Sequence, residues 1–129
     1  MSTTWLWVHE EVVRIIHQEQ LAEHGGGEGV RDSNMLASAL ARPRNLDAYD
    51  EPDVAALAAA YAFAIARNHP FVDGNKRTAA VVAELFLDLH GYVLEADDVE
   101  LVIKMTALAA GDLDEGSLAT WYRDNIGQR

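Results

Sequence analysis

The sequence of 129 residues contains no cysteine and only three prolines. The absence of cysteine excludes disulfides, thiolate nucleophiles and zinc sites with cysteine ligands. Apolar runs are short as well, and none reaches the ~18 residues needed to cross a bilayer. The N-terminus has no basic leader of the kind that begins a secretory signal. We therefore expect a cytoplasmic protein that makes no contact with membranes.

Positive charge is the second scarce property. Lysine and arginine total 10 against 21 aspartates and glutamates, so the net charge is −11, which disfavours direct binding to nucleic acid. The charge is uneven along the chain. Residues 31–77 hold six basic and six acidic side chains, which leaves four bases and 15 acids outside that stretch. This neutral stretch therefore concentrates most of the positive charge.

Half of the residues are hydrophobic, and the length suits a single domain over residues 1–129. Apolar side chains recur at helical spacing, which predicts an all-α fold, a compact bundle of about six helices. We expect these helices over residues 8–22, 33–42, 53–68, 75–90, 98–110 and about 118–126. The segment 53–68 is apolar on nearly all sides, which indicates a central buried helix.

Two segments are assigned no regular structure. Pro43 is expected to end the second helix, because proline lacks the N–H group that the helix interior needs. Residues 43–52, polar and bracketed by prolines, are expected to form a loop or a short hairpin. The alternation around residues 92–94 is too short to predict a sheet, so we expect no strand pair.

The segment HPFVDGNKRTA at residues 69–79 holds the side chains that are candidates for binding and catalysis. It leads into a helix N-terminus, where unpaired N–H groups and the helix dipole attract anions. Lys76 and Arg77 oppose that dipole, a placement that suits a bound phosphate chain. Asp73 is a suitable ligand for Mg²⁺, and His69 has the chemistry of a general base. Together these groups indicate phosphoryl or nucleotidyl transfer.

This segment resembles the signature of the Fic/Doc family, and specifically its Doc branch, the death-on-curing toxins of toxin–antitoxin pairs. Further matches in order and spacing are GGGEGVRD at 25–32, SALARP at 38–43, FAIARNHPF at 63–71 and LHGY at 89–92. The resemblance covers nearly the whole chain. It implies a helical bundle of the Fic/Doc type in which the motif loop leads into a central helix.

The resemblance also implies a reaction. Fic enzymes typically read HPFx(D/E)GNGRxxR and transfer AMP from ATP to a hydroxyl group. Here Lys76 replaces the glycine of GNGR and Ala80 stands at the second arginine. Both departures are typical of Doc, in which the nucleotide is inverted and the γ-phosphate is transferred to a protein. A lysine fills the space that a glycine leaves open, so the phosphates must bind differently.

Roles follow from the motif positions. The resemblance implies that His69 is the general base and that Asp73 binds Mg²⁺. ATP would be the co-substrate, held by Gly74, Asn75, Lys76 and Arg77. Arg67 either reaches the phosphates or is only a favourable charge at a helix C-terminus. The implied target is a Thr/Ser hydroxyl of elongation factor Tu, and an antitoxin would bind across the helical surface near the site.

Two other functions stay open, namely a Fic-type AMP or nucleotide transferase and a non-catalytic module that binds a phosphate or a partner. The inhibitory pattern (S/T)xxxE(G/N) of many Fic proteins is not present, since residues 120–125 carry aspartate in place of its glutamate. Phe71 is expected to anchor the loop in the core. Trp5 and Trp7 are expected to pack against the core, with a surface for a partner as the alternative. Structural or surface roles are expected for the other histidines, namely His9, His17, His24 and His90.

Overall fold

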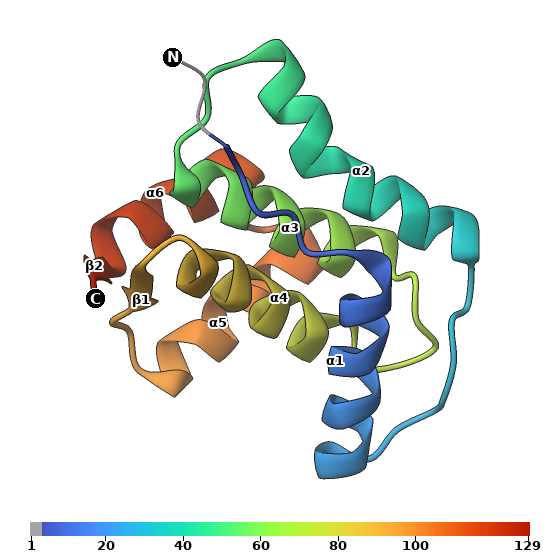
Figure 1. Cartoon of the computed structure of the whole chain (residues 1–129). Helices are drawn as coiled ribbons and strands as arrows, with labels where there is room; N and C mark the ends of the chain where they lie inside the picture. Colours follow the sequence, from blue (N-terminus) through green and yellow to red (C-terminus); the bar gives the residue numbers. More distant parts are fainter. Residues whose placement is uncertain (1–3) are drawn as a thin grey trace.

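A computed structural model describes residues 4–129, which form six helices and two short strands (Figure 1). The all-α prediction with about six helices is confirmed. None of the helices in residues 4–129 is long and apolar enough to cross a membrane. The helices are α1 (Glu10–His24), α2 (Ser33–Tyr49), α3 (Val54–Asn68), α4 (Asn75–Leu89), α5 (Asp98–Ala110) and α6 (Glu115–Asn125).

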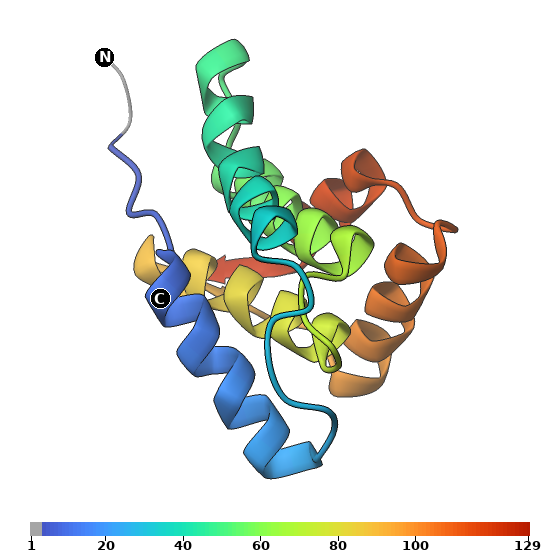
Figure 2. The same ribbon diagram turned by 90° about the vertical axis from the view of Figure 1, so that its right-hand side faces the viewer.

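Helix α3 forms the centre of the bundle, as its sequence predicts. It contacts α2, α4, α5 and α6, and Figures 1 and 2 show it surrounded by them. Eleven of its 15 residues are buried, and seven of those 11 are alanine. Small side chains let the neighbouring helices approach closely, so α3 and α4 can hold the loop between them firmly.

Helix α2 corrects the prediction that Pro43 ends a helix and that 43–52 is a loop. The helix continues through Pro43, whose ring is buried, to Tyr49. Proline inside a helix costs about 3 kcal/mol, but contacts on both sides of it hold this helix. Arg42 makes two hydrogen bonds to Glu115, of 3.0 and 2.7 Å. Further along, Trp5 donates to Asp47 and the Arg44 guanidinium lies 5.4 Å from the Trp7 ring centre, which is tertiary packing that local sequence does not reveal.

The strands correct a second prediction. β1 (Tyr92–Leu94) pairs with β2 (Ile126–Gln128) in an antiparallel ladder, with Val93 opposite Gly127. Three-residue strands are too short to show a period of two. The pairing exists because α4 and α6 both pack against α3, which brings the chain after each helix to the same place.

The segment before α1 packs against the core, which confirms the prediction for Trp5 and Trp7. Both indole rings lie within about 6 Å of the Phe86 ring. The backbone N–H of Leu6 donates to Nε2 of His90. Nδ1 of His90 therefore carries the proton and donates it to the Phe86 carbonyl oxygen at 2.7 Å. His90 is a structural residue, as expected.

Asp53 joins the start of α3 to α6 and yields a stability prediction. Its Oδ1 accepts from the Ala56 N–H as a helix cap, and Arg123 donates to both carboxylate oxygens at 2.6 and 3.0 Å. Replacing Asp53 by alanine is expected to lower the unfolding free energy by about 1–2 kcal/mol, because both cap and ion pair are lost. Asp53→Asn keeps the cap and should cost less than about 1 kcal/mol, since the pair is exposed.

The same residue predicts a pH dependence. The hydrogen bonds from Arg123 lower the pKa of the Asp53 carboxyl below its ordinary value of 3.8. The contribution of the Asp53 carboxylate to the unfolding free energy is therefore fully present above a pH of about 4–5. It is lost as the pH falls through the lowered pKa of this carboxyl. Urea unfolding of the wild type and of Asp53→Asn between pH 2 and 7 measures this pH-dependent contribution to stability. Curves that keep a constant separation down to pH 2 would contradict this role for the carboxylate.

Candidate active site

The motif loop joins α3 to α4 through two left-handed residues. His69 caps α3 with φ 48° and ψ 56°, and Gly74 precedes α4 with φ 78°. His69 is the one non-glycine residue with positive φ among residues 4–129. The two left-handed turns fold residues 69–74 back, so the imidazole end of the loop and the N-terminus of α4 border the same space. The strained backbone at His69 is typical of a functional position.

Two buried side chains hold the loop in this shape. The Asn75 amide donates to the Phe71 carbonyl oxygen and accepts from the Phe71 N–H, both at 3.0 Å. The His17 ring lies flat against the Phe71 ring, with centroids 3.8 Å apart and planes 8° apart. His17 Nε2 also donates to the Asp73 carbonyl oxygen at 2.8 Å. Phe71 is buried, which confirms it as the anchor of the loop.

A second chain segment fixes the other edge of the loop. The connection between α1 and α2 runs beside the loop (Figure 2), with Val30 paired to Phe71 in an isolated antiparallel bridge. The Arg31 guanidinium donates to the His69 carbonyl oxygen at 2.7 Å and to the Asn68 carbonyl oxygen at 3.0 Å. These two bonds cap the end of α3 and stabilise the left-handed turn at His69.

A cavity of about 460 Å³ lies between the loop and the C-terminal half of α5. It brings together most of the residues that the motif singles out. The cavity is lined by the motif loop, the first turn of α4 and the end of α5. The lining residues are His69, Val72, Asp73, Gly74, Asn75, Lys76, Arg77, Thr106, Ala109 and Ala110. The first N–H groups of α4 have no partner inside the helix, so this cavity combines a helix N-terminus with two cationic side chains.

Asp73 is the predicted magnesium ligand. Its Oδ1 accepts from the Gly74 N–H at 2.8 Å, its Oδ2 accepts weakly from Gly27 at 3.4 Å, and the side chain is exposed. No group of three acidic or histidine side chains gathers to hold a metal in the described residues. A single carboxylate fits Mg²⁺ only when phosphate and water supply the other ligands, which is how the ion commonly binds with nucleotides.

The other predicted phosphate ligands differ in their surroundings. Lys76 is exposed at the mouth of the cavity. The Arg77 Nη2 donates to the Gly25 carbonyl oxygen at 3.2 Å, while within residues 4–129 its buried Nε has no hydrogen-bond partner. The Asn75 amide is committed to Phe71, so only its backbone can meet an anion. Arg67 is not among the described residues that line the cavity, and its guanidinium lies over the Phe63 ring and beside Gly111.

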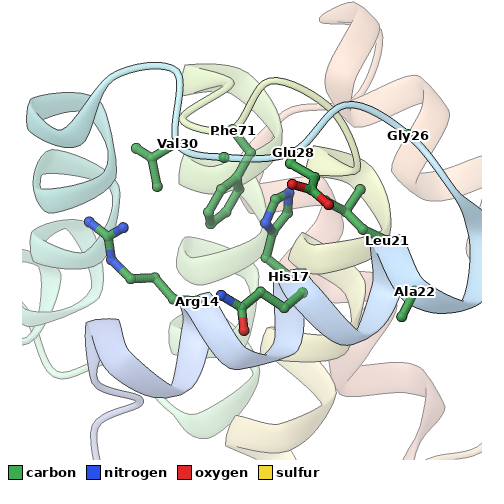
Figure 3. Close-up of a pocket in the computed structure, with 10 residues that line it drawn as sticks. Arg14, His17, Leu21, Ala22, Gly26, Glu28, Val30 and Phe71 are labelled. Carbon is green, nitrogen blue, oxygen red and sulfur yellow. The ribbon is translucent and has the colours of Figure 1, made fainter.

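A different cavity, also of about 460 Å³, lies on the far side of the loop, between α1 and residues 26–30 (Figure 3). Figure 3 shows the His17 and Phe71 rings side by side at its wall, with Arg14 at one end of the cavity. Neither His69 nor Asp73 lines it. Because the predicted base and the predicted metal ligand must both reach the substrate, the cavity that they share is the candidate active site.

Comparison with known proteins identifies the family of this chain. A model of the Fic/DOC family matches residues 7–87, which include α1, α2, α3, the loop and most of α4. The chain belongs to the Fic/Doc family. Toxin Doc from Mycolicibacterium smegmatis is 44% identical over 101 residues, covering 74% of this chain and 76% of that protein. Protein kinase doc from Escherichia phage P1 is 34% identical over 115 residues, covering 88% and 90%.

These relatives place the chain in the Doc branch of the family. Two residues that position the Doc motif, His17 and Arg31, were not assigned such a role from the sequence. His17 shares the buried face of α1 with Val13 and Ile16, and that spacing is the signal for a buried histidine. Arg31 offers no such signal, because its partners lie 37 and 38 residues away.

Proposed function

We propose that this Doc-branch protein is a toxin that transfers the γ-phosphate of ATP to a Thr/Ser hydroxyl of a translation protein, with elongation factor Tu as the first candidate. A cytoplasmic location follows from such a target. The observation that carries the proposal is the shared cavity of His69, Asp73, Lys76 and the N-terminus of α4. The printed name of the phage P1 relative, a protein kinase, supports phosphotransfer.

The proposed reaction uses this cavity as follows. The target hydroxyl loses its proton to His69 as its oxygen attacks the γ-phosphorus, and the bond from that phosphorus to the leaving ADP breaks. Lys76, Arg77 and the N–H groups at the start of α4 would hold the phosphate oxygens. Asp73 would hold Mg²⁺. When bound, Mg²⁺ supplies charge neutralisation for the phosphates.

A Fic-type nucleotide transferase is the second candidate, because the same base and metal ligand serve that reaction. Lys76 and Ala80 favour the kinase, since a Fic enzyme has a glycine and an arginine at those two positions. ATP labelled on the γ-phosphate is expected to label elongation factor Tu or a protein in a bacterial lysate, whereas ATP labelled on the α-phosphate is not. Transfer of the α-label would establish the nucleotide transferase instead, and no transfer of either label by folded protein would favour a binding module.

The proposed toxin needs an antitoxin, and α5 offers a surface for it. Val99, Val102 and Ile103 recur at helical spacing on α5 and are 70%, 63% and 60% exposed. The protein carries a net charge of −11, so a basic amphipathic segment is the complementary partner. Bound on α5, beside Thr106, such a segment would cover the cavity that holds His69.

Replacing Ile103 by aspartate tests that surface. A charge in an apolar contact should weaken the complex with the antitoxin from the neighbouring reading frame by at least about tenfold. Tyr49→Asp, at a residue 90% exposed on α2, is the control and should bind normally. Calorimetry measures both. Equal affinity of the two variants would place the antitoxin elsewhere.

A further inference from the structure

Thr106 brings a hydroxyl group into the candidate active site. It lies in the C-terminal half of α5 and lines the same cavity as His69 and Asp73. Among the described residues that line this cavity, Thr106 is the one with a hydroxyl group. Thr106 is exposed, and it sits on a regular helix that packs against α3 and α4. The cavity therefore holds the predicted base together with an alcohol of the kind that the proposed reaction phosphorylates.

The hydroxyl of Thr106 is free to react. A threonine inside a helix commonly donates its hydroxyl proton to the carbonyl oxygen four residues earlier. Within residues 4–129, Thr120 on α6 is the threonine that does so, with its Oγ1 3.2 Å from the Gly116 carbonyl oxygen. The hydroxyl of Thr106 has no such bond in the described part of the chain, although the residue lies well inside α5. No hydrogen bond within the helix has to break before this oxygen can act as a nucleophile.

We propose that Thr106 is a site of self-phosphorylation, at which the protein places the γ-phosphate of ATP on its own chain. The inference rests on the proposed kinase function. The Thr106 Oγ1 attacks the γ-phosphorus and gives its proton to His69, while the bond from that phosphorus to the oxygen of the leaving ADP breaks. Because the acceptor and the base belong to one molecule, transfer needs no encounter with a target, and a hydroxyl held in the cavity acts as if it were at high concentration.

The product of this step stays in the site that makes it. A phosphothreonine carries a charge of about −1.5 to −2 and three acceptor oxygens. Lys76, Arg77 and the first turn of α4 line the same cavity as Thr106. Within the described residues, the buried Nε of Arg77 has no hydrogen-bond partner, so it is a donor that a phosphate oxygen can meet. The phosphate on Thr106 therefore competes with the phosphates of ATP for these groups, and self-phosphorylation limits the activity of the toxin.

Mass spectrometry of the full chain after incubation with MgATP tests the modification. The wild type is expected to gain one phosphate on Thr106, at a rate per molecule that does not depend on protein concentration. Thr106→Ser keeps the hydroxyl and should be phosphorylated, whereas Thr106→Val should not be. Thr120→Val, the same change at an exposed threonine of α6, is the matched control and should gain the phosphate like the wild type. His69→Asn should slow the gain by at least about 10²-fold.

Calorimetry tests the consequence for binding. The ligand is the magnesium complex of an ATP analogue with an imido group at the β–γ bridge, because this analogue binds without transfer. Prior incubation with MgATP, followed by its removal, should weaken binding of the analogue about tenfold in the wild type. The same treatment should leave the affinity of Thr106→Val unchanged.

Several results would overturn the inference and leave the proposed kinase intact. One is a wild type that phosphorylates a protein in a lysate but gains no phosphate on Thr106. Others are a gain by Thr106→Val equal to that of the wild type, a gain by His69→Asn at the wild-type rate, a rate that rises with protein concentration, and an unchanged affinity after modification. Folded wild-type protein that binds no MgATP and labels neither itself nor a lysate contradicts the proposed function itself.

Discussion

Replacing His69 by asparagine is expected to lower the rate of phosphate transfer by about 10²- to 10⁴-fold, the usual contribution of a general base. Asparagine is the appropriate replacement because His69 has φ 48°, and asparagine tolerates the left-handed region that alanine disfavours. The side chain is exposed, so the fold should survive. The measurement is transfer of γ-labelled phosphate together with a thermal melt.

The control for this experiment is His9→Asn, at an exposed histidine whose side chain makes no cap hydrogen bond to α1. It should keep full transfer. In cells, growth arrest should disappear with His69→Asn and persist with His9→Asn. Transfer by His69→Asn at the wild-type rate would mean that another group accepts the proton. Growth arrest without transfer would point to the non-catalytic module.

Removing His17 should have the largest effect on stability among the residues that hold the loop. His17→Ala deletes a buried ring stacked on Phe71 and the hydrogen bond to the Asp73 carbonyl oxygen. The expected loss is about 2–4 kcal/mol of unfolding free energy, from the cavity and the unpaired group. His17→Phe keeps a ring of similar shape but not the donor, and should lose about 1–2 kcal/mol.

The two variants separate packing from positioning. Because His17→Phe leaves the stacked ring in place, any loss of MgATP affinity in folded protein reports the position of Asp73 and Gly74. Ile15→Ala, at a residue 54% exposed on the same helix, is the control and should stay within about 0.5 kcal/mol. Urea unfolding supplies the free energies. A wild-type unfolding curve for His17→Ala would show that the loop holds its shape without this histidine.

Most helices and the motif loop were predictable from sequence because their signals are local. Asp53, Asp97 and the glycines at 25 and 111 mark helix ends close to the observed ones. The prediction failed at Pro43, where a local rule was overridden by contacts to α6 and to the N-terminal segment. It failed again at β1 and β2, whose pairing joins segments more than 30 residues apart.

At the active site, too, local sequence signals identified some residues, whereas tertiary contacts decided the place of others. His69, Asp73, Lys76 and Arg77 line one cavity, and the motif had already singled them out. Arg67 does not line it, because its side chain turns toward Phe63 and Gly111. The roles of these residues in binding and catalysis stay predictions that the experiments above test.

The sequence by itself determined the helical architecture and the chemical groups of the loop, since a base, a carboxylate and two cations lie within nine residues at a helix start. Only the tertiary structure decided what holds them. His17 meets Asp73 across 56 residues of chain, and Arg31 meets His69 across 38. It also decided that the C-terminal half of α5 lines the same cavity as the loop. Periodicity and capping act within a few residues, whereas these contacts depend on how whole helices pack.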